Sequence, residues 1–157
     1  MRWLRQWGPA VAWAAVIFAL SSQSFSASAT SRFILPLLKW LFPHTPHETL
    51  AWLHFLIRKS AHFTEYFVLS LLVLRGIRGE RKGWELRWAL ATIAVVACYA
   101  VLDEVHQAFV PQRSASPYDS MIDTAGAMVA QLAAWASHRW HTHRTAYAEP
   151  RPRPSGS

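Results

Sequence analysis

The chain has 157 residues, of which 52% are hydrophobic and only 16% charged, with 16 lysines and arginines against nine acidic residues. The hydrophobic content excludes an intrinsically disordered protein, and a single cysteine, Cys98, excludes a disulfide scaffold. A net charge of +7 raises nucleic acid as a partner, but the distribution of the basic residues along the chain decides that question.

Four mainly apolar stretches predict four helices, at about residues 8–24, 54–74, 86–106 and 119–137. A helix of about 20 mainly apolar residues is long enough to cross the hydrocarbon core of a bilayer. The uncharged parts of the third and fourth stretches are shorter than this, so a soluble helical bundle is the alternative interpretation. We expect an all-α fold, with a small polytopic membrane domain of four transmembrane helices over residues 1–137.

The positions of the basic residues and tryptophans favour the membrane interpretation. If the N- and C-termini are cytoplasmic, eleven of the sixteen basic residues fall on the cytoplasmic side, in agreement with the positive-inside rule. Eight of the nine tryptophans lie toward helix ends, as in interfacial aromatic belts, and only Trp13 lies mid-span. The sequence therefore predicts a multi-pass protein of the inner (cytoplasmic) membrane, with membrane lipids as partners and no nucleic acid.

Three further segments predict features other than transmembrane helices. The N-terminal apolar run and the triplet Ala27-Ser28-Ala29 also fit a cleaved signal peptide, whose removal would leave the later topology unchanged. Residues 32–40 predict a short amphipathic segment at the outer interface. Residues 138–157 contain four arginines and three prolines, which predicts a basic, disordered cytoplasmic tail close to anionic lipid.

Ionisable side chains gather at the predicted outer ends of the second, third and fourth helices, where charged groups are costly and usually functional. Carboxylates beside imidazoles are suited to general acid–base chemistry, and cations beside them can hold an anionic ligand. The candidate acid–base residues are His62, Glu65, Asp103, Glu104 and His106. The candidate ligand-binding residues are Arg58, Lys59, Gln107, Arg113, Asp119 and Asp123.

A structural role for the same residues is the main alternative. Arg58 and Lys59 lie at a positive helix end, and Asp103 and Glu104 lie at a negative one, so each charge opposes its helix dipole. Pairing between these antiparallel helices would relieve that conflict and only fix helix packing. Gly126 fits a close contact between helices. The residues that could also hold a divalent metal are His62, Asp103, His106, Asp119 and Asp123. No spacing matches a metal-binding signature, so we predict no metal and no cofactor.

Three segments, in order along the chain, resemble motifs of the VanZ-like family. They are Ser21-Ser22-Gln23, RKSAHFTEY at 58–66 and DEVHQAFVPQR at 103–113, followed by Asp119, Asp123 and Gly126. The resemblance covers about residues 13–135. Gln112 replaces the glycine usual before the arginine, and Asp123 stands where asparagine is common. The family is named for an accessory protein of teicoplanin resistance, and the resemblance implies a membrane architecture and the same polar cluster without naming a substrate.

We therefore expect an envelope protein whose outward-facing polar pocket binds a lipid-linked or peptidoglycan-related ligand. Arg58, Lys59 and Arg113 would hold an anionic group, which the acidic and imidazole side chains would orient or protonate. Besides the structural alternative, the ionisable residues could form a proton or ion relay, but the inner halves of the helices carry almost no ionisable residues. The sequence leaves open whether the protein is an enzyme and whether it forms oligomers.

Overall fold

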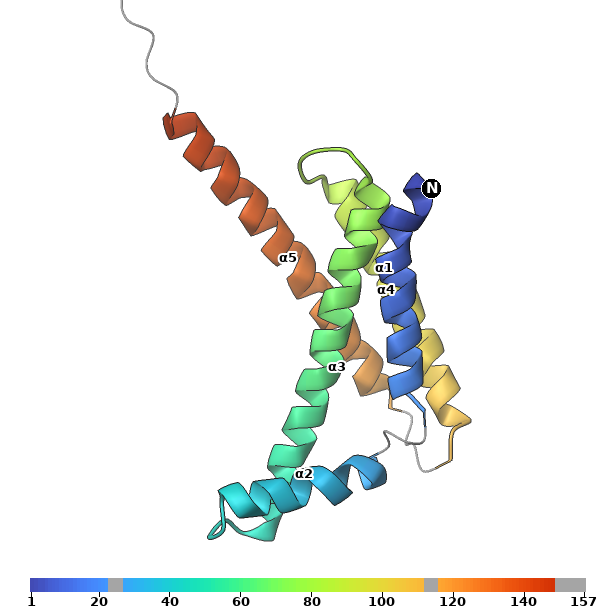
Figure 1. Cartoon of the computed structure of the whole chain (residues 1–157), viewed down its shortest axis with the longest axis vertical. Helices are drawn as coiled ribbons and strands as arrows, with labels where there is room; N and C mark the ends of the chain where they lie inside the picture. Colours follow the sequence, from blue (N-terminus) through green and yellow to red (C-terminus); the bar gives the residue numbers. More distant parts are fainter. Residues whose placement is uncertain (23–26, 112–115, 149–157) are drawn as a thin grey trace, which may run out of the picture.

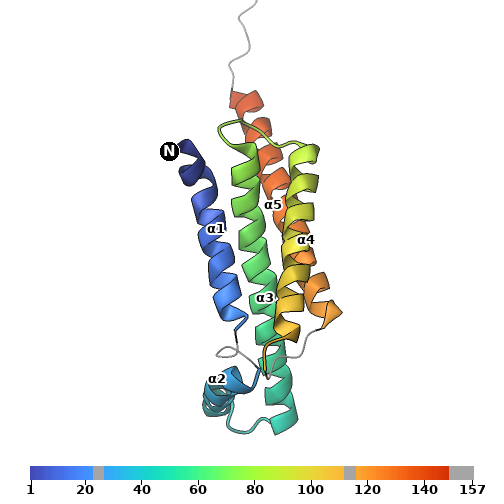
Figure 2. The same ribbon diagram turned by 90° about the vertical axis from the view of Figure 1, so that its right-hand side faces the viewer.

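The computed structural model describes residues 1–22, 27–111 and 116–148, and this part of the chain is entirely α-helical apart from its connections. Four long helices form a bundle, and a shorter helix, α2, lies across one end of it (Figures 1 and 2). The helices are α1 (Arg2–Leu20), α2 (Ala27–Leu41), α3 (His47–Arg78), α4 (Leu86–Ala108) and α5 (Pro117–Ala148). The all-α prediction is confirmed, and the amphipathic segment predicted at 32–40 belongs to α2.

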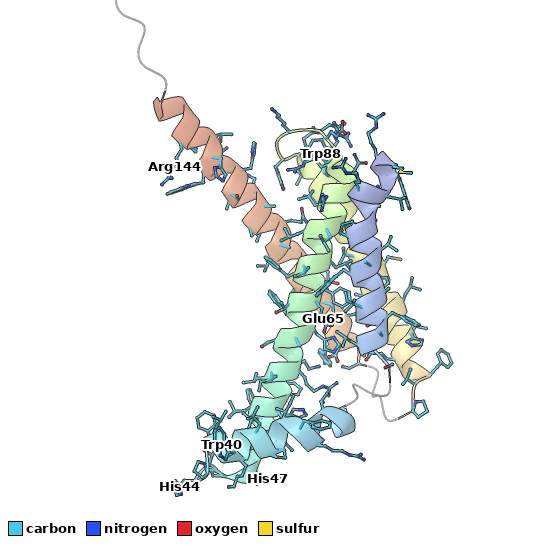
Figure 3. All side chains as sticks on the ribbon, viewed as in Figure 1. Trp40, His44, His47, Glu65, Trp88 and Arg144 are labelled. Atoms are coloured by element: carbon cyan, nitrogen blue, oxygen red, sulfur yellow. The ribbon has the colours of Figure 1, made fainter. Side chains whose placement is uncertain are left out.

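The bundle places most basic residues at one end. The start of α1, the end of α3, the start of α4 and the C-terminal half of α5 lie at this end, and α2 lies at the other (Figure 1). We call the two the basic end and the α2 end. The arginines and lysines at the basic end are Arg2, Arg5, Arg75, Arg78, Arg81, Lys82, Arg87, Arg139 and Arg144. Figure 3 labels His44 and His47 at the α2 end and Trp88 and Arg144 toward the basic end.

Helix α3 is the centre of the bundle, because all four other helices pack against it. Its closest approach is to α5, where Gly126 lies so near the backbone of Phe63 that a Cβ atom would overlap the Phe63 carbonyl oxygen. The prediction that Gly126 allows close helix packing is therefore confirmed. The core between the helices is formed by Ala10, Ile17, Tyr66, Leu69, Val73, Val96, Ala100 and Ala127.

Helices α3 and α5 are longer than predicted, at 32 residues each, and α1 begins and ends earlier than predicted. The predicted disordered tail is wrong for residues 138–148, which continue α5. The physical reason is that α5 contains no glycine or proline after Gly126, and basic residues favour a helix as long as no breaker interrupts it. Residues 149–157 of the predicted tail lie outside the described residues.

Of the described helices, α4 is the one that is long and apolar enough to cross a membrane by composition, with a mean hydropathy of 1.7. Helices α1, α3 and α5 do not combine the required length, hydropathy and low number of charges. In α3 the charged and polar residues of the candidate site interrupt the apolar sequence. Membrane crossing by the four long helices, and the side on which the termini lie, stay predictions from the charge and tryptophan pattern.

Candidate functional site

Asp103 in α4 holds three helices together at the α2 end. Its side chain is almost completely buried, with 4% of the residue exposed. One carboxylate oxygen, Oδ2, accepts hydrogen bonds from the hydroxyl of Ser21 at 2.8 Å, the amide of Gln107 at 2.9 Å and the hydroxyl of Tyr66 at 3.2 Å. Ser21 ends α1 and Tyr66 lies in α3, so this Asp103 cluster joins α1, α3 and α4.

The basic residues of α3 do not neutralise Asp103. Lys59 instead forms an ion pair with Asp119, in the first turn of α5. Glu104 accepts a hydrogen bond from the backbone N–H of Ser116, just before α5 begins. The pairing of Lys59 with Asp103 or Glu104, which the structural alternative invokes, is not formed, because Lys59 is directed toward α5 and pairs with Asp119.

His62 and Asp123 form a second contact between α3 and α5. The Nδ1 atom of His62 lies 3.5 Å from Oδ1 of Asp123, which is within ion-pair distance. The geometry does not make a hydrogen bond, and both atoms are buried without another partner in the described part of the chain. A carboxylate and an imidazole in this arrangement can share or transfer a proton when a third group approaches them.

The remaining candidate residues lie in different surroundings. Trp13 donates a hydrogen bond of 2.9 Å to the backbone carbonyl of Glu65, which explains why this tryptophan lies in the middle of α1. The ring of His106 stacks on Phe18, with the ring centroids 4.4 Å apart. Arg113 lies outside the described residues.

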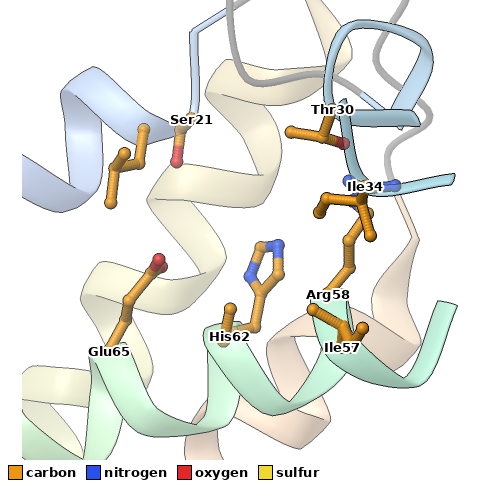
Figure 4. Close-up of a pocket in the computed structure, with 9 residues that line it drawn as sticks. Ser21, Thr30, Ile34, Ile57, Arg58, His62 and Glu65 are labelled. Atoms are coloured by element: carbon orange, nitrogen blue, oxygen red, sulfur yellow. The ribbon is translucent and has the colours of Figure 1, made fainter. Parts of the chain in front are cut away.

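A pocket of about 160 Å³ lies between the end of α1, α2 and α3 (Figure 4). Figure 4 shows Arg58, His62 and Glu65 on α3, with Ser21 and Thr30 on the opposite walls. The apolar lining consists of Leu20, Ile34, Ile57 and Ala61. The pocket therefore joins a cation, a carboxylate and an imidazole to an apolar wall.

Three residues that the sequence analysis did not select help to build this region. Ser21 belongs both to the Asp103 cluster and to the pocket, and it starts the first of the family motifs. Tyr66 shares a helix face with Lys59 and His62, a spacing that could have identified it. Thr30 lies 3.3 Å from the ring of His54, so a polar contact connects α2 to α3.

Among the described residues, no three histidine, cysteine, aspartate or glutamate side chains are grouped closely enough to hold a metal ion. The polar side chains at the α2 end instead form hydrogen bonds and ion pairs with one another. Chemically, the guanidinium of Arg58 is a group that can bind an anion, and the imidazole of His62 is a group that can exchange a proton.

The family model described as VanZ/LLP1 matches residues 7–138 of the chain. The chain belongs to the VanZ/LLP1 family. This confirms the resemblance seen in the three motifs, and the match includes the Asp103 cluster, both α3–α5 pairs and the pocket. No curated protein and no solved structure matches this VanZ/LLP1 chain.

Proposed function

We propose that this VanZ/LLP1 protein is a multi-pass protein of the inner membrane whose outward-facing pocket binds a lipid-linked or peptidoglycan-related ligand of the cell envelope. In this proposal α1, α3, α4 and α5 cross the membrane and both termini are cytoplasmic. The basic end then faces the cytoplasm, in keeping with the positive-inside rule. The α2 end, with its pocket, faces outward.

The exposed apolar surface of the bundle supports the membrane part of the proposal. Soluble monomeric proteins rarely expose large contiguous apolar patches, whereas a lipid environment favours them. Large apolar side chains on α1, α4 and α5 are more than half exposed, and they include Val11, Phe18, Leu90, Val101, Leu102 and Leu132. Together with the apolar α4, these side chains form a surface suited to acyl chains.

The composition of the pocket is the observation that carries the ligand assignment. Arg58 is the cation in its lining, and a guanidinium binds phosphate or carboxylate oxygens in a bidentate manner. Ile34 and Ile57 provide the apolar wall that an amphipathic molecule needs. Because Lys59 is already paired with Asp119, Arg58 is the residue that would bind the anionic group.

The other candidate residues then take distinct roles. His62, backed by Asp123, and Glu65 would orient the ligand or exchange a proton with it. Asp103 would position Ser21 and the end of α1, and so shape one wall of the pocket. Arg113 stays a predicted second cation near the ligand.

The proposal is tested by complementing a deletion strain with Arg58→Gln and with Arg32→Gln, at equal protein levels. Arg32 is an exposed arginine on α2, so the second variant removes the same charge at the same end but outside the pocket lining. Lipid and muropeptide profiles are compared between strains. We expect Arg58→Gln to resemble the deletion and Arg32→Gln to resemble the wild type. Full complementation by Arg58→Gln would contradict the proposal.

A purely structural role is the second candidate function, and the Asp103 cluster favours it because all three donors to Asp103 come from the protein itself. In that case both arginine variants would complement fully, and only variants that unfold the bundle would fail. A proton or ion relay through His62, Glu65, Asp103 and Asp123 has less support, since the helices carry no acidic residue between this group and the basic end. Proteoliposomes without pH-dependent flux would exclude the relay.

A further inference from the structure

A second and larger cavity, of about 370 Å³, lies at the basic end, far from the pocket beside α2. It is formed by the last turns of α3, the connection between α3 and α4, and the C-terminal half of α5. Its polar lining consists of Arg75, Arg78, Trp84, Ser137, His138 and His141. None of these residues takes part in the site described above.

Donor groups in this cavity lack acceptors. The Nε atom of Arg78 and the Nε1 atom of Trp84 are buried, and neither has a hydrogen-bond partner within the described ranges. Arg75 uses one guanidinium nitrogen to donate to the backbone carbonyl of Arg5, at 3.1 Å. No carboxylate of the described residues forms an ion pair with either arginine. Because buried donors are rarely left unsatisfied, the cavity is suited to an anion that accepts several hydrogen bonds.

The cavity also has an apolar side, formed by Leu71, Leu74 and Ala134. Leu71 and Leu74 lie one turn before Arg75 and Arg78 in α3, and Ala134 lies one turn before His138 in α5. In this region α5 leans away from the other helices (Figure 1). An anionic group at the arginines could therefore continue into apolar chains alongside Leu71 and Leu74, which free phosphate would leave uncovered.

We propose that this cavity binds the headgroup of an anionic phospholipid of the cytoplasmic leaflet. The phosphodiester oxygens accept hydrogen bonds from Arg75, Arg78 and the indole N–H of Trp84, and the acyl chains lie against Leu71 and Leu74. Basic pockets between helices on the cytoplasmic side are suited to such headgroups. This inference uses the membrane orientation given under the proposed function, but it is independent of any ligand in the pocket at the α2 end.

The bound lipid would connect α5 to the end of α3. The strongest packing between these helices is around Gly126, and the C-terminal half of α5 leans away from the bundle beyond it. A headgroup between Arg78 on α3 and His138 on α5 would fix the angle between the two helices. We therefore expect the lipid to stabilise the folded protein and to stay bound during purification.

The test measures thermal unfolding of the full chain in neutral detergent with added cardiolipin, phosphatidylglycerol, phosphatidylcholine or inorganic phosphate. Two double variants are measured beside the wild type. The cavity variant carries both Arg75→Gln and Arg78→Gln, and the surface variant carries both Arg139→Gln and Arg144→Gln on the exposed surface of α5. Both lose two positive charges at the same end. We expect the cavity variant to need at least about tenfold more anionic lipid for the same rise in Tm, and the surface variant to behave as the wild type.

Equal losses in the two double variants would overturn the proposal, since they would show attraction by overall charge alone. Equal stabilisation of the wild type by phosphatidylcholine or by inorganic phosphate would also overturn it. Because Arg75 contacts Arg5, the cavity variant could fail to fold, and Ala134→Phe then decides. This change fills the cavity without altering charge, and we expect native mass spectrometry to show loss of the copurified anionic lipid. Lipid retention equal to that of the wild type would contradict the proposal.

Discussion

Two buried aspartates at the α2 end, Asp103 and Asp123, differ in the hydrogen bonds that their side chains receive. Asp103 receives three hydrogen bonds from uncharged donors, at 2.8 to 3.2 Å, on three different helices. Asp123 is more deeply buried, with 1% exposed, yet its nearest charged partner, His62, is 3.5 Å away and not hydrogen-bonded to it. Each aspartate has one buried oxygen, Oδ1, without a hydrogen-bond partner among the described residues. What differs is that Oδ2 of Asp103 joins three helices through hydrogen bonds, whereas Asp123 faces the imidazole of His62.

This difference separates structural from functional residues within one polar cluster. A network whose members satisfy one another rigidifies a core, and removing any member is costly. A buried polar pair without a hydrogen bond lowers the stability of the fold, so its presence calls for another explanation. One such explanation is that a ligand supplies the missing hydrogen bond. His62 lines the pocket and Asp103 does not, in agreement with this division.

The largest effect on stability is expected for Asp103→Ala. The change leaves the donors of Ser21, Tyr66 and Gln107 without their shared acceptor in a buried site. We expect a loss of about 3–5 kcal/mol in the free energy of unfolding, because each unsatisfied donor costs roughly 1–3 kcal/mol and partial relaxation recovers some of it. Thermal or denaturant unfolding in detergent measures the effect.

The matched controls for this prediction are Asp103→Asn, which keeps an acceptor oxygen, and Glu48→Ala, which removes an exposed acidic residue from the first turn of α3. We expect intermediate destabilisation for the first and almost none for the second. If Asp103→Ala is no less stable than Glu48→Ala, the Asp103 cluster does not hold the bundle together. The distinction between Asp103 and Asp123 would then be wrong.

Removal of one partner of the Lys59–Asp119 ion pair should have the next largest effect. The Lys59 side chain is 22% exposed, so we expect Lys59→Ala to cost about 2–3 kcal/mol, below the roughly 3–5 kcal/mol typical of a fully buried pair. A double variant that exchanges the two residues should recover part of the loss, as measured by a double-mutant cycle of unfolding free energies. An exchange of Lys59 with Asp103 should recover nothing, and recovery there would mean that α3 pairs with α4.

The Lys59–Asp119 ion pair also shows which features can be predicted from the sequence alone and which cannot. The all-α fold, the amphipathic segment of α2 and the role of Gly126 all follow from hydrophobic patterning and residue size. The spacing along α3 places Lys59, His62 and Tyr66 on one side of the helix. It contains no information on which neighbouring helix each of them meets: Lys59 and His62 lie against α5, whereas Tyr66 donates a hydrogen bond to Asp103 of α4.

The same limit applies to the other misassigned and missed residues. Asp103 and His106 are three residues apart and both face the end of α1, where Asp103 bonds to Ser21 and His106 stacks on Phe18, but the spacing does not identify these partners. Ser70 and Gln131 form a buried hydrogen bond of 2.8 Å between α3 and α5, which no local pattern marks because each residue is a single polar position in an apolar stretch. Tertiary contacts of this kind depend on crossing angles, which short sequence motifs do not encode.

A change at the α3–α5 crossing tests how much the close packing at Gly126 contributes to stability. In Gly126→Ala the new methyl group meets the carbonyl oxygen of Phe63, next to His62, so the helices must move apart. We expect a loss of about 2 kcal/mol, within the range for overpacking. Gly8→Ala is the control, since a Cβ there has no atom within 4 Å, and we expect it to stabilise the protein slightly. Destabilisation of equal size in both variants would show that the α3–α5 contact at Gly126 tolerates a methyl group as well as the open site at Gly8 does.

The smallest effect on stability, and the most informative about function, is expected for His62→Gln. The imidazole makes no hydrogen bond to Asp123, and glutamine keeps a polar group facing that carboxylate, so we expect the free energy of unfolding to fall by less than about 1 kcal/mol. Complementation of the deletion strain should nevertheless be lost, because glutamine cannot exchange a proton with a ligand in the pocket. If His62→Gln instead unfolds as readily as Asp103→Ala, both aspartates serve the fold, and the pocket loses its strongest candidate for acid–base chemistry.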